Sequence, residues 1–400
     1  MLEHPVAAPS PPARIATFTA PNAKAGEPYR AKIEGRVDDE VVPVIAAAIP
    51  ASTGLAFDLV TGELHGLPLN SGDFRLAFKW KDRGVVRIAR CALFVNANPR
   101  SLWKTIDADA TDPYFKPNED AACLAVPGFH IVAASKRGRS HAHVGSFRDD
   151  DFFIEHDADS GWSLIIVADG AGSAPYSRRG SQLAVNCAGA KLLAALKGDV
   201  GAQALQALST WDADPTASHK ALYNHFYYTY QQAAVESVQA IEVEAKAKGK
   251  PVREFATTLL AAAVHRDGDN TFLATFWMGD GVIAAYGPIG HVRLMGAPDS
   301  GEYAGQTRFL DREALTSADF GKRVSIGRYS GLAAIIVATD GVSDPLFETD
   351  NGLADPARWD HLWGEIAPAL ASAAPEVGLL GWLDFFIPGH HDDRTLAVLW

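Results

Sequence analysis

The stretch Ser163-Leu-Ile-Ile-Val-Ala168, followed at once by Asp169-Gly170-Ala171-Gly172, decides the fold. A short unbroken apolar run of this kind, bounded by a turn signal, is typical of a fully buried strand. The aspartate places a carboxylate at the rim of the core, and the glycines let the backbone turn sharply there. We therefore expect a buried strand that ends in a chemically important acid.

The same pattern, an apolar strand with acids at its tip, recurs elsewhere. The other examples are residues 333–339 before Asp340-Gly341, 272–278 before Gly279-Asp280-Gly281, 395–400 after His391-Asp392-Asp393-Arg394, and 152–154 after Arg148-Asp149-Asp150-Asp151. If neighbouring strands are antiparallel, Asp169, Asp340 and Asp392 share one sheet edge. Carboxylates that close cannot all stay ionised without cations, and Mg²⁺ or Mn²⁺ suits sites of carboxylate and water. One Asp-Gly pair is usually only a turn, but so many acid-tipped strands favour a metal site.

Composition is that of an ordinary globular protein. Of the 400 residues, 48% are hydrophobic and 21% are charged, which allows at least one large core and two domains. The net charge of −12 argues against general binding of nucleic acid or anionic lipid. The three cysteines, Cys91, Cys123 and Cys187, fit neither a disulfide framework nor a zinc site. With no signal peptide and no apolar run long enough to span a bilayer, we expect a cytoplasmic protein that does not bind membranes.

The chain divides into four segments by pattern. Residues 1–13 are rich in Pro and Ala and predict a mobile tail. Residues 14–97 alternate as short strands with turn signals, which predicts a small β-sandwich. Residues 98–125, with Asn-Pro and Lys-Pro-Asn steps, read as a linker, and residues 126–400 form a mixed α/β domain. In that domain we expect strands at 128–134, 163–168, 259–265, 272–278, 282–286, 333–338 and 395–399, and helices at 178–196, 219–248 and 358–370.

The β-sandwich segment resembles the immunoglobulin-like domains of bacterial proteins. The resemblance is carried by Gly26-Glu-Pro-Tyr29, by Gly54-Leu-Ala-Phe-Asp-Leu-Val-Thr-Gly-Glu-Leu-His-Gly-Leu-Pro68 and by Gly72-Asp-Phe-Arg-Leu-Ala-Phe78. It covers most of the first hundred residues. It implies a fold and says almost nothing about a ligand.

The order of motifs from about residue 129 to 400 resembles the bacterial metal-dependent protein phosphatases of type 2C. The matching motifs are Gly138-Arg-Ser-His141, Arg148-Asp-Asp-Asp-Phe152, Val167-Ala-Asp-Gly-Ala-Gly172, Thr257-Thr-Leu-Leu260, Gly279-Asp-Gly281, Ala338-Thr-Asp-Gly-Val-Ser-Asp344 and Asp392-Asp-Arg-Thr395. Each motif is weak alone, but the ordered set is specific. The resemblance implies an α+β fold, a four-layer α-β-β-α sandwich of two antiparallel sheets, with a two-metal centre at one end.

The resemblance also implies roles for individual residues. Asp169 would bridge two metals, the Gly170 carbonyl would bind one of them, and Asp340 and Asp392 would complete the site. Asp150 would hold metal-bound water with Asp149 beside it, and Asp280 and Asp344 would form a weaker third site. Two cations about 3.5–4 Å apart activate a water that attacks phosphorus in line. No covalent phosphoenzyme is needed, in keeping with the lack of a Cys-x5-Arg motif.

This chain departs from the family pattern in two places. Ala171 stands where many eukaryotic members have histidine, so the leaving group would be protonated by water or another residue. Val144 and Gly145 occupy the places of an arginine that holds phosphate in many members. Arg137 and Arg148 are nearby, but we expect Arg139 and His141 to replace it. His141 can instead be a purely structural residue in its loop.

Three functions remain open from the sequence. The first is an active phosphoserine and phosphothreonine phosphatase, acting on phosphorylated proteins opposite a cognate Ser/Thr kinase. The second is a non-catalytic relative that serves as a scaffold or binds phosphoproteins, although no metal-ligand acid is lost. The third assigns partner or glycan binding to the β-sandwich. Tyr29, Phe74 and Trp80 are too few aromatic residues to argue for glycans.

Overall fold

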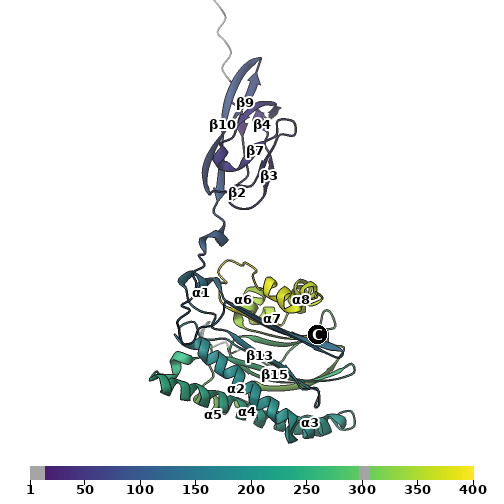
Figure 1. Ribbon diagram of the computed structural model, residues 1–400. Coiled ribbons are helices and arrows are strands. Elements are labelled where there is room, and N and C mark those ends of the chain that lie inside the picture. The colour runs from purple at the N-terminus through teal and green to yellow at the C-terminus, as the bar shows by residue number, and fades with distance from the viewer. Residues whose placement is uncertain (1–13, 297–298, 300–306) are drawn as a thin grey trace, which may run out of the picture. The chain divides into compact units, whose positions relative to one another are not determined.

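The computed structural model describes residues 14–296, 299 and 307–400, so the predicted mobile tail at residues 1–13 lies outside the described residues. The chain forms two compact units, Met1–Trp103 and Lys104–Trp400 (Figure 1). Every helix in the described ranges is too short or too polar to cross a membrane.

Unit 1 is built from strands alone, apart from two 3-10 turns. Its largest sheet has the order β2-β10-β9-β6, in which β9 and β10 form a long antiparallel hairpin (Figure 1). Leu76, Phe78 and Trp80 of β9 alternate inward and are at most 1% exposed. The predicted all-β architecture of this part is confirmed. The strands are β1 (Thr17–Phe18), β2 (Ala23–Lys24), β3 (Tyr29–Lys32), β4 (Gly35–Val37), β5 (Glu40–Val42), β6 (Val44–Ala48), β7 (Leu55–Phe57), β8 (Glu63–Gly66), β9 (Gly72–Asp82) and β10 (Val85–Asn96).

Unit 2 contains two sheets in which every strand pair is antiparallel. The six-stranded sheet has the order β11 (Glu119–Val126), β12 (Phe129–Lys136), β21 (Arg394–Leu399), β20 (Ala334–Ala338), β17 (Val282–Tyr286), β18 (Val292–Leu294). The five-stranded sheet has the order β13 (Asp151–His156), β14 (Trp162–Ala168), β15 (Leu259–Asp267), β16 (Asn270–Met278), β19 (Val324–Ser330).

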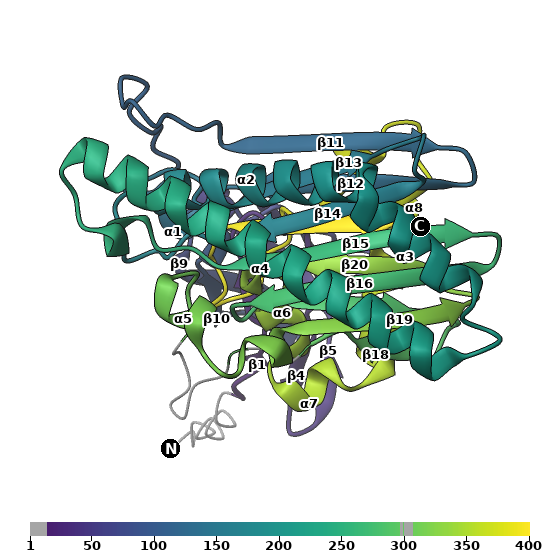
Figure 2. The same ribbon diagram turned by 90° about the horizontal axis from the view of Figure 1, so that it is seen from below.

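Helices cover the outer face of each sheet. The helices α2 (Ser177–Lys197), α3 (Asp199–Ser209) and α4 (Pro215–Lys248) lie over the five-stranded sheet (Figure 2). The six-stranded sheet is covered by α6 (Asp340–Phe347), α7 (Asp350–Leu353), α8 (Pro356–Leu370) and α9 (Pro375–Trp382). Two short helices, α1 (Arg139–Val144) and α5 (Arg312–Thr316), complete the unit. The predicted four-layer α-β-β-α sandwich is confirmed.

The unbroken apolar run of β14 is explained by its place between two cores. Ile165 and Val167 pack between the two sheets, while Leu164 and Ile166 pack under α2 and α4. Because both faces are buried, no polar residue interrupts the strand from Leu164 to Ala168. The strand therefore ends directly in the first acid of the site.

Two stretches differ from the sequence prediction. Glu119–Val126, which falls in the predicted linker, is strand β11 and pairs along its whole length with β12. Most of its side chains are only half-buried, so its sequence lacks the strong apolar pattern of a core strand. Asp340 and Gly341, for which no helix was predicted, begin helix α6.

The hydroxyl of Tyr230 links α4 to the five-stranded sheet. It donates to the Ala274 carbonyl at 2.7 Å and accepts from the Ala263 amide at 3.1 Å, and the residue is 1% exposed. Tyr230→Phe keeps the ring but leaves both buried backbone groups without this partner. We expect it to lower the free energy of unfolding by about 1–3 kcal/mol, measured by urea denaturation. Tyr228→Phe on the same helix, at a side chain 60% exposed, should change it by less than about 0.5 kcal/mol.

Candidate active site

The acid-tipped strands of unit 2 meet at one edge of the two sheets. Asp151 at the start of β13 pairs with Ala168 at the end of β14, and Ala338 at the end of β20 pairs with Leu396 near the start of β21. Val282 at the start of β17 also pairs with Ala338. The antiparallel pairing therefore carries the connecting loops, and the acids within them, to a common edge.

Three of the predicted metal ligands form one group. Asp169, Asp280 and Asp340 each offer a carboxylate oxygen, and these oxygens lie within 4.8 Å of one another. Burial, followed by the charges of Asp340 and Asp150, raises the pKa of Asp169 well above its ordinary value. Burial and the charge of Asp280 raise the pKa of Asp340 in the same way. The repulsion between ionised carboxylates expected from the sequence is therefore present in the fold.

Asp344 and Asp392 border this group. Asp344 lies one turn after Asp340 on α6, and burial and the charge of Asp280 raise its pKa. The charge of Asp392 contributes to the raised pKa of both Asp169 and Asp340. Asp392 is thus near enough for its charge to act on both carboxylates, but its own ligand atom lies within 4.8 Å of those of His141 and Asp393. A shared metal site of Asp169, Asp340 and Asp392 stays a prediction.

The carboxylate of Asp150 links the two sheets beside this group. Its side chain is fully buried, and its Oδ2 atom accepts hydrogen bonds from the hydroxyls of Thr339 and Thr395, both at 2.8 Å. Burial and the charge of Asp393 raise the pKa of Asp150 to about 7. Thr395 lies in β21 and Thr339 directly follows β20, while Asp150 directly precedes β13 of the other sheet. One carboxylate therefore links the edges of both sheets.

Two buried carboxylate oxygens in this region lack a partner among the described residues. They are Oδ1 of Asp150 and Oδ1 of Asp280, whose Oδ2 accepts from the Thr307 hydroxyl. A buried oxygen left unpaired is costly, and a hard cation would satisfy it. An all-oxygen donor set of mutually repelling carboxylates fits Mg²⁺ or Mn²⁺.

The backbone of Asp169 and Gly170 is held by two threonines on the neighbouring chain segment. The Asp169 amide donates to the Thr258 hydroxyl at 2.8 Å, and its carbonyl accepts from the Thr257 hydroxyl at 2.8 Å. Gly170 forms an isolated bridge with Thr257. These bonds fix the direction in which the Asp169 carboxylate leaves the strand.

A second group contains a histidine and two acids. His141, Asp392 and Asp393 offer ligand atoms within 4.8 Å of one another. Asp393 is fully buried and accepts from the Gly138 amide at 2.6 Å, from the Asp149 amide, and from His141 Nδ1 at 3.0 Å. Asp393 therefore holds together the loops before β13, before β21 and before α1.

Charge balance in this group favours a cationic imidazole. Burial acts to lower the pKa of His141, but the hydrogen bond that His141 donates to Asp393 and the charges of Asp393 and Asp149 outweigh it and raise the pKa to about 10. Burial also raises the pKa of Asp149, to about 6, helped by the charge of Asp393. The His141 Nε2 atom lies 4.0 Å from the Asp149 carboxylate.

Arg139 has a different environment from the one expected. Its guanidinium donates to the carbonyls of Asp384 and Phe385 and to the Asp384 carboxylate, at 2.8–3.0 Å. These contacts tie α1 to the segment after α9. A role for Arg139 in holding phosphate stays a prediction, and its contacts favour anchoring instead.

Close backbone packing explains two glycines of the predicted motifs. A Cβ atom on Gly341 would lie 1.8 Å from the Asp393 carbonyl, and one on Gly138 would lie 2.3 Å from the Asp392 backbone. Both positions press against the loop that carries Asp392 and Asp393. Only glycine allows this approach. The absence of a side chain at these two positions therefore lets the loop with Asp392 and Asp393 lie where it does.

The family model described as protein phosphatase 2C matches residues 137–384. This chain belongs to the protein phosphatase 2C family. The match begins at the site histidine loop and includes all of the predicted ligands except Asp392. No curated relative matches the chain.

Several solved structures of bacterial proteins are similar to this chain at low sequence identity. One is PppA, a key regulatory component of the T6SS in Pseudomonas aeruginosa, with 16% identity and a TM-score of 0.36 over 71% of this chain and 97% of that one. Another is the S. agalactiae serine/threonine phosphatase, with 16% identity and a TM-score of 0.38 over 70% and 99%. A third is the catalytic domain of PstP with two manganese ions, with 15% identity and a TM-score of 0.37 over 70% and 98%.

Sequence reasoning missed several residues of the phosphatase 2C site. Asp393 received no role, although it lies beside Asp392 in the same motif, and Thr339 and Thr395 were quoted without one. The only feature of the sequence that could have indicated a role for these residues is that each adjoins a predicted ligand or the start of a predicted strand. Which of two adjacent acids faces inward depends on how the loop enters β21, and the sequence does not show that.

Proposed function

We propose that this chain is a metal-dependent phosphatase that removes phosphate from phosphoserine and phosphothreonine in proteins. The observation that carries the proposal is the convergence of Asp169, Asp280 and Asp340, with buried unpaired oxygens on Asp150 and Asp280. Membership of the protein phosphatase 2C family supports the phosphoprotein substrate. Phosphorylation by a Ser/Thr kinase would generate that substrate, so a kinase is the expected counterpart in signalling.

The residues have the following proposed roles. Asp169, the Gly170 carbonyl, Asp340 and Asp392 hold two Mg²⁺ or Mn²⁺ ions, and Asp280 and Asp344 hold a third. Bound divalent ions lower the pKa of water and neutralise phosphoryl oxygens. Asp150, fixed by two threonine hydroxyls, orients the attacking water.

The chain's own groups account for the remaining steps. The oxygen of water forms a bond to phosphorus in line with the Ser or Thr oxygen, whose bond to phosphorus breaks, and inorganic phosphate leaves. His141 is cationic near neutral pH and lies where it can offset the negative charge that gathers on the phosphoryl group. The leaving oxygen takes its proton from solvent, since Ala171 offers none.

A metal titration tests this function. The purified chain is assayed with p-nitrophenyl phosphate and with a phosphothreonine peptide while Mn²⁺ or Mg²⁺ is added after treatment with EDTA. We expect turnover to rise from near zero and to saturate, and EDTA to reverse it. Turnover that ignores EDTA would contradict the metal dependence, and no turnover of either substrate at any metal concentration would favour the non-catalytic scaffold.

A further inference from the structure

The outer face of the β9–β10 hairpin in unit 1 is exposed and carries both apolar and basic side chains. We call it the hairpin face. Alternation along the two strands points Val86, Ile88 and Phe94 outward, and they are 53%, 64% and 46% exposed. The full set is Arg75, Ala77, Lys79 and Lys81 on β9 with Val86, Ile88, Arg90, Ala92 and Phe94 on β10. Exposed apolar residues gathered on one face mark an interaction site more often than scattered ones do.

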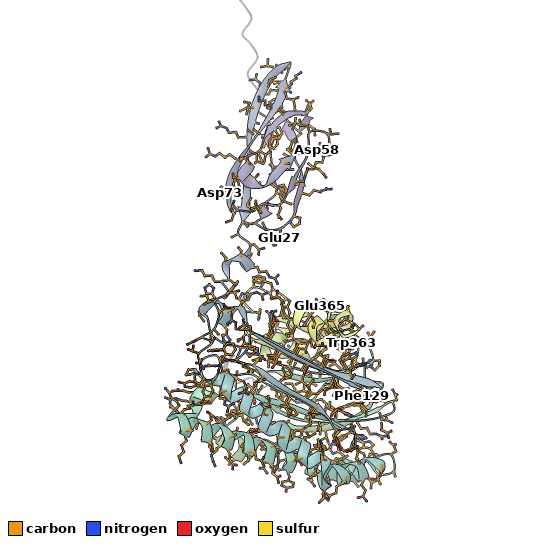
Figure 3. The ribbon with its side chains drawn as sticks, viewed as in Figure 1. Glu27, Asp58, Asp73, Phe129, Trp363 and Glu365 are labelled. Carbon is orange, nitrogen blue, oxygen red and sulfur yellow. The ribbon has the colours of Figure 1, made fainter. Side chains whose placement is uncertain are left out.

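The strand register places basic and apolar residues of this face side by side. Lys81 pairs with Val86, Lys79 with Ile88, and Arg75 with Ala92. Arg90 stands opposite Ala77 in the same ladder. The four cations are therefore interleaved with the apolar side chains. Asp73, which is labelled in Figure 3 near the start of β9 and pairs with Phe94, is the single acid on the outer side of either strand in the described structure.

The cations of the hairpin face differ from the others of unit 1. Lysines and arginines on its other strands form ion pairs, such as Lys32 and Arg36 with Glu34. Among the described residues, Arg75, Lys79, Lys81 and Arg90 have no carboxylate close enough for an ion pair. In a chain with 48 acids and 36 bases, four neighbouring unpaired cations leave a local positive field that an acidic partner can neutralise.

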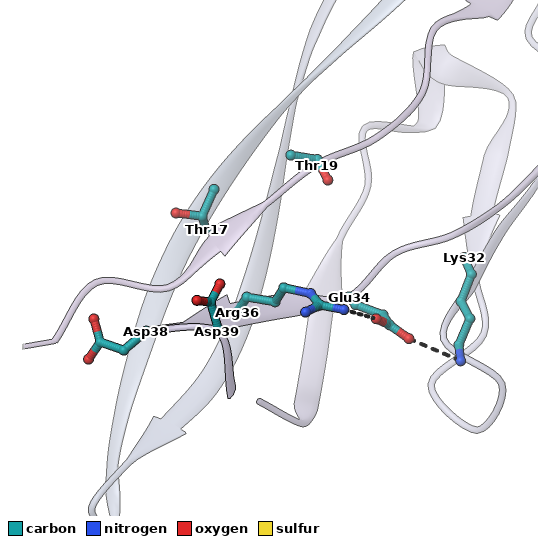
Figure 4. Close-up of a pocket in the computed structure, with 7 residues that line it drawn as sticks. All are labelled: Thr17, Thr19, Lys32, Glu34, Arg36, Asp38 and Asp39. Carbon is teal, nitrogen blue, oxygen red and sulfur yellow. Dashed lines mark hydrogen bonds and ion pairs between the residues drawn. The ribbon is translucent and has the colours of Figure 1, made fainter. Parts of the chain in front are cut away.

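The groove on the other side of unit 1 is a weaker candidate. Thr17, Thr19, Lys32, Glu34, Arg36, Asp38 and Asp39 line it (Figure 4). Its cations are already neutralised by Glu34, as the dashed lines in Figure 4 show. Aromatic residues that would stack on a sugar are also absent from this lining, and Trp80 is buried in the core.

Charge is divided unevenly between the two units. Unit 1 contains 12 of the 36 Lys and Arg residues and 10 of the 48 Asp and Glu residues, so its net charge is +2 and that of unit 2 is −14. The net negative charge of unit 2 repels a phosphoprotein that is rich in acidic residues. Binding of that phosphoprotein to unit 1 would offset this repulsion. A docking surface in the same chain raises the effective concentration of the phosphorylated segment.

We propose that the hairpin face docks acidic segments of the protein substrate, with aliphatic or aromatic side chains of that segment on the Val86–Ile88–Phe94 ridge. This proposal rests on the proposed function and specifies the substrate class as phosphoproteins with an acidic, partly apolar segment away from the phosphorylated residue. Nucleic acid fits poorly because it offers nothing to the apolar ridge. An anionic membrane would need a larger positive field than a net charge of +2 supplies.

The first experiment compares matched variants of the full chain in turnover. Lys79→Glu with Arg90→Glu reverses two charges on the hairpin face, and Arg30→Glu with Lys32→Glu reverses two on β3. With phosphorylated casein, an acidic phosphoprotein, we expect the hairpin variant to raise KM by about tenfold with kcat unchanged. Its kinetics on p-nitrophenyl phosphate should equal those of the parent, as should all kinetics of the β3 variant. Equal KM values for the two variants would overturn the proposal.

The second experiment measures binding without turnover. Fluorescent dephosphorylated casein is titrated with the full chain and with Ile88→Ser, which removes the centre of the ridge and leaves the charges. We expect weaker binding by Ile88→Ser and weaker binding in high salt. Binding in this assay without any phosphatase turnover would overturn the proposed function alone, while turnover with hairpin-independent casein binding would overturn the docking proposal alone. The docking proposal would also be overturned if the hairpin face bound phosphatidylserine vesicles or duplex DNA more tightly than casein.

Discussion

Asp169→Asn is expected to lower metal-dependent hydrolysis of p-nitrophenyl phosphate by about 10³-fold or more with the fold intact. The substitution keeps the shape of the side chain but removes the charge that faces Asp340 and Asp150. Divalent ions contribute several kcal/mol to such a reaction, and each ~1.4 kcal/mol corresponds to a factor of ten in rate. Initial rates at saturating Mn²⁺ measure the effect.

A stability measurement separates loss of metal binding from loss of fold. The clustered carboxylates repel one another, so Mn²⁺ should raise the melting temperature of the parent chain strongly. In Asp169→Asn we expect little rise with Mn²⁺, and a metal-free melting temperature equal to or above that of the parent. Asp267→Asn, an exposed position at the end of β15, should match the parent in both assays. An active Asp169→Asn protein would contradict the proposed role of this residue.

The parts of the fold that the sequence predicts best are those with the strongest burial. The apolar runs of β14, β16 and β20 are buried throughout, and an uninterrupted run is a signal that periodicity can detect. β11 escaped prediction because it lies at the edge of its sheet, where half-buried side chains carry no clear pattern. Its pairing with β12 depends on the rest of the sheet, which local sequence does not describe.

The residues of the candidate site also divide into those that the local sequence predicts and those that depend on distant parts of the chain. The acids at strand ends are predictable because a carboxylate that directly follows a buried strand must lie at the edge of the sheet. Antiparallel pairing then brings the ends of some strands and the starts of others to the same edge. The partners of Arg139 were not predictable, since Asp384 and Phe385 lie about 245 residues away in the chain. The same is true of Asp393, whose three hydrogen bonds come from the residue before α1, from α1 itself and from the loop before β13.

Asp393→Asn is the second substitution with a large expected effect, and it acts on stability. Asp393 is 2% exposed and pairs with His141 while accepting two backbone amides. Removing one member of a buried ion pair costs about 3–5 kcal/mol, and here it leaves His141 with only the more distant Asp149 carboxylate at 4.0 Å and the charge of Asp392. We expect a loss of that size in the free energy of unfolding, measured by urea denaturation with EDTA present. Asp392→Asn, at the adjacent and exposed carboxylate, should cost less than about 0.5 kcal/mol.

The pH dependence of this loss follows from the two pKa shifts. Burial alone would raise the pKa of Asp393, but the hydrogen bond from His141 and the two amides lower it, so its contribution to stability is present above its ordinary value of 3.8 and is lost as the pH falls. The pKa of His141 is raised from 6.5 to about 10, so its contribution is complete below pH 6.5 and is lost as the pH rises through 10. The difference between parent and Asp393→Asn should therefore be largest between about pH 4 and 6.5 and shrink towards pH 10. A difference that grows from pH 6.5 to 9 would show that His141 is not held in its cationic form by Asp393.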